Sequence, residues 1–167
     1  TAGLPSGSTF PIGTTTNTFI VTDSSGNTAT CSFDVTVNDT EAPAITCPGN
    51  IIQSNDPGVC GAVITYTAPV GTDNCPGSTT VQTAGLASGE TFPIGTTTNT
   101  FVVTDASGNT ATCSFDVTIN DNEAPVANCA APFTIQLDAN GDASITVADI
   151  DNGSTDNCAI ASTSIDI

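Results

Sequence analysis

A tandem repeat of 82 residues is the feature that most constrains how this chain folds. Residues 1–43 and 83–125 are identical at 37 of 43 positions, and the same spacing separates Cys31 from Cys113. Near-identity over such a length is typical of a unit that was copied in tandem and that folds as one module. The chain is therefore predicted to be a stretch of an array in which similar modules follow one another.

The repeat also indicates where each module begins and ends. A polar run closed by proline, Asn38–Pro43, recurs as Asn120–Pro125 after a segment of strand-like composition. We predict three domains: the C-terminal half of a repeat at residues 1–40, a complete repeat at 41–122 and the N-terminal half of a variant repeat at 123–167. We expect these residues to be an internal segment of a longer secreted protein.

The variant repeat differs from the complete one in its first half. Residues 136–142 replace the turn at 55–60 of the complete repeat. The sequence Asp-Asn-Cys at 156–158 then returns to the pattern found at 73–75. The array is therefore predicted to contain two repeat subtypes.

Segments of strand composition alternate with turn residues through each module. Residues 63–67, 101–104 and 113–119 are rich in β-branched and aromatic side chains, and the run Asp-Ala-Ser-Gly-Asn at 105–109 predicts a hairpin loop. No segment combines helical periodicity with helix caps. About seven short strands in each module predict an all-β fold of tandem immunoglobulin-like β-sandwich modules.

The charge balance excludes several classes of function. The chain has 17 acidic residues and no Lys, Arg or His, which gives a formal net charge of −17. It lacks the cations that bind nucleic acid and the side chains that most often serve as general base or Schiff-base amine. We predict no enzyme activity and no nucleic acid partner. The absence of a long apolar run predicts no membrane insertion by this segment.

The cysteines indicate the compartment. Seven of them stand at positions 31, 47, 60, 75, 113, 129 and 158, without a CxxC pair and without a His to complete a zinc site. Small β-modules with modest cores use disulfides in oxidising compartments. The pattern predicts a disulfide-stapled protein that is extracellular or at the cell surface; reduced, buried thiols are the alternative.

Short motifs follow one another through the complete repeat. In order, they are Ala42-Pro43, Cys47-Pro48, Asp56-Pro57-Gly58, Thr72-Asp73-Asn74, Thr91-Phe92-Pro93-Ile94-Gly95-Thr96, and Thr104-Asp105 through Gly108-Asn109 to Cys113-Ser114-Phe115. In this order they resemble the hyalin repeat (HYR) family of immunoglobulin-like extracellular modules. The four-cysteine version is similar to modules of very long bacterial surface proteins. The resemblance implies a role in adhesion, matrix or surface architecture, without a catalytic centre.

The resemblance also implies how the cysteines pair. Simpler members of the family keep only the first and last positions, which implies a Cys47–Cys113 disulfide and leaves Cys60 to pair with Cys75. Each bridge is expected to stabilise the fold by about 3 to 4 kcal/mol through loop-closure entropy. The second pair is geometrically difficult, because a strand that starts at Cys60 would separate the two sulfur atoms, unless that strand bends or the next loop folds back. The partners of Cys31, Cys129 and Cys158 are expected outside these 167 residues.

Acidic and amide side chains predict a metal site at each junction between modules. In a sandwich, the linker and the loops after the second and sixth strands meet at one end, and calcium takes six to eight oxygen ligands. The predicted calcium ligands are Asp39, Glu41, Asp73, Asn74 and Asp105 at the first junction and Asp121, Glu123, Asp156 and Asn157 at the second. The alternative is that these residues only form Asx-turns.

Together these features predict a structural or adhesive segment of a long secreted or cell-surface repeat protein, with each module a rigid link. The expected partners are the neighbouring repeats and, in a fibre or filament, identical chains. The alternative is a binding module that recognises a surface polysaccharide or a partner protein. A single Tyr and no Trp offer little for stacking on sugar rings.

Overall fold

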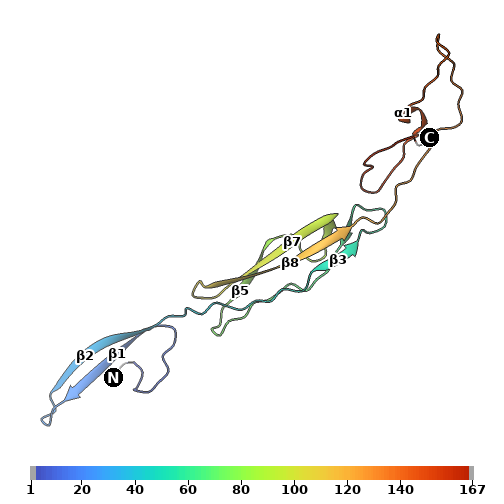
Figure 1. The fold of residues 1–167 in the computed structure, drawn as a ribbon. Helices are drawn as coiled ribbons and strands as arrows, with labels where there is room; N and C mark the ends of the chain where they lie inside the picture. The colour runs from blue at the N-terminus through green and yellow to red at the C-terminus, as the bar shows by residue number, and fades with distance from the viewer. Residues whose placement is uncertain (1–2, 166–167) are drawn as a thin grey trace. The chain divides into compact units, whose positions relative to one another are not determined.

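The computed structural model describes residues 3–165, and nearly all of their regular structure is β (Figure 1). In chain order the elements are β1 (Gly13–Thr22), β2 (Thr28–Val37), β3 (Ile51–Ser54), β4 (Gly61–Val63), β5 (Thr79–Ala84), β6 (Thr91–Pro93), β7 (Gly95–Thr104), β8 (Thr110–Asn120) and α1 (Val147–Ile150). The prediction of an all-β chain is confirmed.

The first two strands form an antiparallel hairpin. β1 pairs with β2 from Gly13 opposite Val37 to Thr22 opposite Thr28. The loop between them is held by the carboxylate of Asp23, which accepts hydrogen bonds from the main-chain N–H groups two and four residues further on, at 2.9 and 2.8 Å. This is an Asx-turn, the local chemistry that the Asp-x-Ser-Gly-Asn loop predicts.

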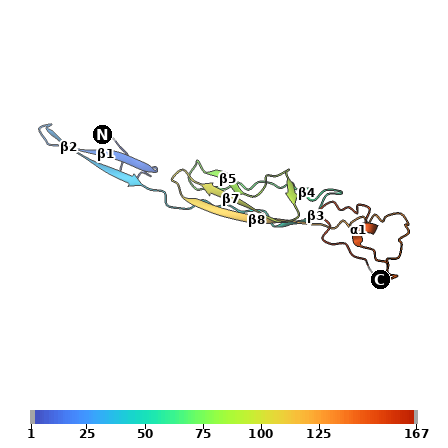
Figure 2. The same cartoon turned by 90° about the horizontal axis from the view of Figure 1, so that it is seen from above.

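The complete repeat forms two sheets. One has the strand order β3-β8-β7-β5, and the other consists of the antiparallel pair β4-β6. In both views of the ribbon, β3 lies beside β8 and β8 beside β7 (Figures 1 and 2). β3 runs parallel to β8, from Ile51 opposite Val117 to Ser54 opposite Asn120, so strands from the start and the end of the repeat are neighbours.

The core lies between these two sheets. Its buried members are Ala62, Ile64, Phe92, Phe101, Phe115, Val117 and Ile119. They come from β4 and β6 on one side, with Ile64 directly after β4, and from β7 and β8 on the other. The fold is therefore the predicted disulfide-stapled β-sandwich, with a contiguous apolar core.

The single tyrosine closes one part of this core. The ring of Tyr66 packs edge-on against Phe115, with ring centroids 5.1 Å apart, and against Phe101 at 6.4 Å. Its hydroxyl donates a hydrogen bond to the carbonyl of Leu86 at 2.7 Å. Residues 64–67 lie outside the strands, although their composition predicted a strand that continued through them.

Two disulfides are formed within the described residues. Cys47, before β3, is bonded to Cys113 in β8 with a Cα–Cα distance of 5.6 Å, which is the pair implied by the family resemblance. Cys60 is bonded to Cys158 of the variant repeat. The expected Cys60–Cys75 pair is therefore wrong in this structure, and so is the expectation that Cys158 has its partner outside these residues.

The physical reason is the one that made the Cys60–Cys75 pair difficult. Cys60 ends a turn directly before β4, and this turn contacts residues of the variant repeat. Cys75 lies in a different loop, beside Asp39 and Asp73. Each sulfur atom therefore has its own set of neighbours, and that of Cys60 is bonded to Cys158.

The variant repeat contains one element that the sequence did not predict. α1 (Val147–Ile150) is a single helical turn, capped by Asp149, whose carboxylate accepts hydrogen bonds from the main-chain N–H and the hydroxyl of Thr146 at 2.8 and 2.7 Å. A single turn is too short to show a helical period in the sequence. No helix in the described part of the chain is long and apolar enough to cross a membrane.

The chain divides into two compact units. The first contains the N-terminal hairpin, the linker as far as Ala44, and the loops Gly71–Thr79 and Val103–Ala111. The second contains the rest of the complete repeat and the variant repeat. The predicted domain boundaries, after residues 40 and 122, stay predictions.

Candidate functional site

The first junction is organised by a short main-chain pairing between the linker and a loop. Ala44 and Thr72 exchange two hydrogen bonds, each of 2.8 Å. The side-chain amide of Asn109 donates to the carbonyl of Asp39 at 3.3 Å. Linker residues are thereby brought to the loops 71–79 and 103–111, which belong to the same compact unit.

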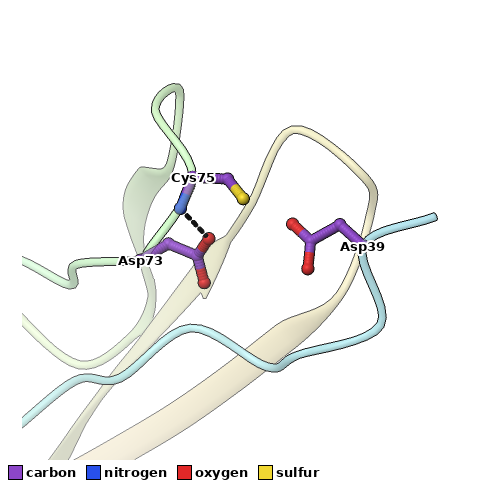
Figure 3. A group of neighbouring side chains, drawn as sticks. All are labelled: Asp39, Asp73 and Cys75. Atoms are coloured by element: carbon purple, nitrogen blue, oxygen red, sulfur yellow. Dashed lines mark hydrogen bonds between the residues drawn. The ribbon is translucent and has the colours of Figure 1, made fainter. Parts of the chain in front are cut away.

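Asp39, Asp73 and Cys75 form a cluster at this junction. One ligand atom from each lies within 4.8 Å of the others, and Figure 3 shows the Cys75 sulfur and the Asp39 carboxylate turned toward the same space. The main-chain N–H of Cys75 donates to the Asp73 carboxylate at 2.8 Å. Burial, a hydrogen bond to Asp39 and the negative charges of Asp39, Asp73 and Asp105 raise the pKa of the Cys75 thiol.

The remaining predicted ligands of this junction have other partners. The side-chain amide of Asn74 donates to the carboxylate of Glu41 at 2.6 Å. Asp105 accepts hydrogen bonds inside its own loop, from the N–H groups of Ser107 and Asn109 at 2.9 and 2.8 Å. Burial opposes ionisation of Asp105, but these bonds outweigh it and hold the pKa of the carboxyl below its ordinary value. Asp105 is therefore engaged in the Asx-turn named as the alternative.

These contacts bear on the predicted calcium site. Asp39 and Asp73 present carboxylates to one space, as a hard cation requires, but the third group beside them is a thiol, which suits softer metals. The oxygens of Asp105 are directed to its own loop. Two of the five predicted ligands thus share a cluster, and calcium binding at the first junction stays a prediction.

The second junction has the same framework but contains an additional segment. Val126 and Thr155 exchange main-chain hydrogen bonds of 2.8 and 3.0 Å. Against them lies the turn Asn55–Cys60, which we call the linking turn. The carboxylate of Glu123 accepts hydrogen bonds from the N–H of Gly58, at 3.1 Å to one oxygen and 2.9 Å to the other.

Two more contacts fix the linking turn. The side-chain amide of Asn157 donates to the carbonyl of Val59 at 3.2 Å, and Cys60 is bonded to Cys158. We call Glu123, Asn157 and Cys158, which bind the linking turn, the receptor residues of the second junction. Three consecutive residues of the turn, Gly58 to Cys60, are thus bound by one group each.

The predicted metal ligands of the second junction therefore serve mainly to bind a turn. Asp121 accepts a hydrogen bond from the N–H of Glu123 at 3.1 Å, and Asp156 accepts one from the N–H of Cys158 at 3.4 Å. Both therefore orient receptor residues. The described residues of this junction contain no cluster of three acidic or thiol groups like the one at the first. Calcium binding here also stays a prediction.

Gly58, Val59 and Cys60 were not predicted as residues of the junction. Two signals pointed to them: the Asp-Asn-Cys pattern recurs at 73–75 and 156–158, and the Cys60–Cys75 pair was geometrically poor. Together these signals favour a partner for Cys60 in the next repeat.

A large apolar cleft borders the N-terminal hairpin and has a structural explanation. It measures about 790 Å³, and Phe10, Phe19 and Phe33 contribute to its lining. Phe19 and Phe33 correspond to Phe101 and Phe115, which are core residues of the complete repeat. The cleft therefore lies on the face of the hairpin that corresponds to the core-facing side of β7 and β8, and this correspondence explains its apolar character.

Comparison with known proteins agrees with this architecture. The HYR domain family matches residues 1–37 and 38–119. Hyalin of Strongylocentrotus purpuratus is 44% identical over 117 residues, which cover 68% of this chain and 10% of that protein. Sushi, von Willebrand factor type A, EGF and pentraxin domain-containing protein 1 of Rattus norvegicus is 35% identical over 130 residues, covering 75% of this chain and 3% of that protein.

A bacterial protein has a similar segment. The serine-rich adhesin for platelets of Staphylococcus aureus is 33% identical over 147 residues, covering 72% of this chain and 6% of that protein. The chain thus spans a tenth or less of each of these three relatives. The family and these relatives confirm the prediction that this segment is extracellular and is not an enzyme. With the repeat, the β-sandwich and the cysteine pattern in agreement, the chain belongs to the HYR domain family.

Proposed function

We propose that this chain is a load-bearing segment of a long extracellular protein that serves adhesion or surface architecture, and that its HYR modules are links joined by disulfides as well as by the peptide chain. The observation that carries the proposal is the Cys60–Cys158 bond, which joins two successive repeats. A module that acts alone has no need of a covalent bond to its neighbour.

The two disulfides protect different parts of the chain under tension. The Cys47–Cys113 bond bypasses residues 48–112, so a force along the backbone does not have to pass through most of the sandwich. The Cys60–Cys158 bond bypasses the linker that follows β8. Because the two bypassed segments overlap, the backbone between Cys47 and Cys158 always has a parallel covalent path.

The acidic surface and the relatives support the same function. A net charge of −17 without a single cation favours solubility of the surface. One relative is named as an adhesin, and in the others the segment that matches this chain is a small part of a large protein. A repeated link that contributes reach and strength is consistent with such proteins.

Pulling single molecules of the native protein tests the load-bearing role. In oxidising buffer the repeats should resist extension, because the Cys47–Cys113 bond bypasses the sandwich and the Cys60–Cys158 bond bypasses the linker after β8. After reduction, each 82-residue repeat should unfold separately and release about 300 Å of chain, from about 3.6 Å per residue. Equal extension before and after reduction would contradict the proposal.

Localisation and electron microscopy test the extracellular array. A membrane-impermeant label should reach the native protein on intact cells, and micrographs should contain chains of modules. We further expect identical chains to associate in a fibre. Isolated flexible monomers would contradict the fibre, and a reduced protein inside the cell would contradict the array itself.

A further inference from the structure

The two junctions share one backbone framework. Ala44 and Thr72 form the main-chain pair of the first, and Val126 and Thr155 form that of the second. Each residue of the first pair precedes its counterpart by 82 or 83 positions. The two sites are therefore equivalent places in successive repeats.

The receptor residues of the second junction have counterparts in the first junction. Glu41 corresponds to Glu123, and Asn74-Cys75 corresponds to the pair at 157–158. Here the amide of Asn74 donates to Glu41 at 2.6 Å, and Cys75 is a free thiol. The three groups that bind the linking turn at the second junction are thus present at the first, but two of them bond each other.

The surface hollows at the two junctions correspond residue by residue. The hollow at the first junction is lined by Glu41, Ala42, Ala44, Thr72, Asp73 and Asn74. The hollow at the second is lined by their counterparts Glu123, Ala124, Val126, Thr155, Asp156 and Asn157, and in addition by Gly58 of the linking turn. What distinguishes the two hollows is the presence of the turn.

We propose that Glu41, Asn74 and Cys75 form the receptor for a linking turn from the preceding repeat, the one to which residues 1–40 belong, and that Cys75 forms a disulfide with the counterpart of Cys60 in that turn. The occupant has the sequence Asn-Asp-Pro-Gly-Val-Cys, as in Asn55–Cys60. This inference rests on the proposed function, because it requires repeats joined in an extracellular array.

The bond forms by ordinary thiol oxidation. The S–H bonds of Cys75 and of its partner break, one S–S bond forms, and two electrons and two protons reduce the disulfide of an oxidant to two thiols. The oxidant is a thiol–disulfide exchange protein or a small disulfide of the oxidising compartment. A hydrogen bond donated by the turn to Glu41 and one donated by the Asn74 amide to the turn, like those at the second junction, hold the two sulfur atoms together.

The variant repeat sets the limit of this linkage. It has the equivalent of Cys75, Cys158, but the segment 136–142 replaces the linking turn and contains no cysteine. Its own turn is closed internally, since Asp138 accepts from the N–H groups of Asn140 and Asp142 at 2.8 and 2.9 Å. A complete repeat can thus form two disulfides to its neighbours, one through the cysteine of its linking turn and one through its receptor cysteine. The variant repeat has the receptor cysteine but no cysteine in the turn.

Disulfide mapping of the native full-length protein tests the inference. Free thiols are alkylated without reduction, and the protein is cleaved at acidic and aromatic residues, because these 167 residues contain no Lys or Arg for trypsin. The peptide that contains Cys75 can be identified by its sequence, because Cys75 is followed by Pro-Gly whereas Cys158 is followed by Ala-Ile. We expect the Cys75 peptide to be bonded to an Asp-Pro-Gly-Val-Cys peptide. An alkylated Cys75, or a bond to any other sequence, would overturn the inference.

Cleavage of the linker distinguishes a bond between repeats from one within a repeat. After cutting at Asp39 or Glu41, the two repeats should stay together until they are reduced, whereas a Cys60–Cys75 bond would let them separate at once. In the 167-residue chain, a thiol-activated peptide of the sequence 54–61 should label Cys75 ahead of the exposed Cys31 and Cys129. Glu41→Ala should remove this preference and Glu41→Gln should keep part of it; equal labelling of the three thiols would contradict the receptor.

The tests of the Cys75 receptor and of the proposed function can fail independently. If Cys75 is free while the protein forms a surface array that resists extension, the receptor is wrong and the array stands. If the protein is reduced and intracellular, the array is wrong whatever Cys75 binds.

Discussion

The hairpins β1–β2 and β7–β8 have nearly the same sequence and very different surroundings. Their local bonds agree: Thr14 and Thr36 hydroxyls lie 3.0 Å apart in one, and Thr96 and Thr118 hydroxyls lie 3.0 Å apart in the other. Their burial does not. The rings of Phe19 and Phe33 are 59% and 55% exposed, whereas their counterparts in β7 and β8 are 4% and 2% exposed.

This difference separates what the sequence of a hairpin determines from what its partners supply. Cross-strand pairs and turn hydrogen bonds are local, so both copies form them. Burial requires the opposite sheet, and in the complete repeat β4 and β6 provide it. Replacing equivalent residues in the two copies therefore measures the contribution of the sandwich directly. Tyr66 is the only tyrosine and packs in the complete repeat, so its fluorescence reports on that core alone.

The largest difference is expected for the core phenylalanines. Phe101→Ala should lower the free energy of unfolding of the complete repeat by roughly 3–5 kcal/mol, because it leaves a cavity beside Tyr66 and Phe115. The matched control Phe19→Ala should leave the urea transition of Tyr66 unchanged. Similar losses from both variants would show that the exposed hairpin contributes to the same core and would contradict the comparison.

The cysteines in β8 and β2 give the next largest difference. Cys113→Ser breaks the bond to Cys47, which spans 66 residues, and should destabilise the complete repeat by about 3 to 4 kcal/mol through loop entropy in the unfolded chain. In the 167-residue chain, Cys31→Ser at the equivalent position removes an exposed free thiol and should change little. Urea denaturation without reductant measures both. If added reductant destabilises Cys113→Ser by the same amount as the parent chain, the bond is not the cause.

The features of the structure that could be predicted from the sequence are the local ones, and those that could not depend on contacts with other parts of the chain. The repeat, the strands and the Asx-turns are local or periodic, and each could be predicted. The Cys47–Cys113 pair came from resemblance to a family and not from geometry. The Cys60–Cys158 bond could not be assigned, because it depends on where a turn before β4 lies relative to the next repeat, which no local pattern encodes.

Only Asp39 and Asp73 of the candidate metal ligands share a cluster, for a related reason. The sequence shows that Asp105, Glu41 and Asp39 lie near the ends of modules. It does not show which groups donate hydrogen bonds to their carboxylates. In the structure, Asp105 closes its own loop and Glu41 accepts from Asn74. Carboxylates that satisfy main-chain N–H groups are common at turns, so their presence alone does not predict a cation.

A smaller effect is expected for the buried asparagine of β7. Asn99 accepts hydrogen bonds from the N–H of Leu86 at 2.8 Å and from the amide of Gln82 at 3.1 Å. Asn99→Ala should therefore cost about 1–3 kcal/mol, because it leaves these donors without an acceptor. Its counterpart Asn17 accepts from the N–H of Leu4, and Asn17→Ala should not move the Tyr66 transition. A neutral Asn99→Ala would indicate that water replaces the lost acceptor.

The smallest effect is expected at the loops, where the two copies should behave alike. The hydrogen bond from the side-chain amide of Asn27, followed by those from main-chain N–H groups, lowers the pKa of Asp23, and the bonds within the 105–109 loop lower that of Asp105 against an opposing effect of burial. Because both folded-state pKa values lie below the ordinary value of about 3.9, the carboxylates stabilise their loops above that pH. The stabilisation should be lost as the pH falls through the folded-state pKa.

NMR titration of the side-chain carboxyl carbons measures both groups in one sample. Asn109→Ala should raise the pKa of Asp105, because it removes a side-chain donor 2.8 Å from the carboxylate, and should leave that of Asp23 unchanged. The equivalent Asn27→Ala should do the reverse. If Asp23 instead titrates at the ordinary value while Asp105 does not, the turn depends on the packed sandwich and not on its own sequence. The hairpins would then differ in their loops as well as in their cores.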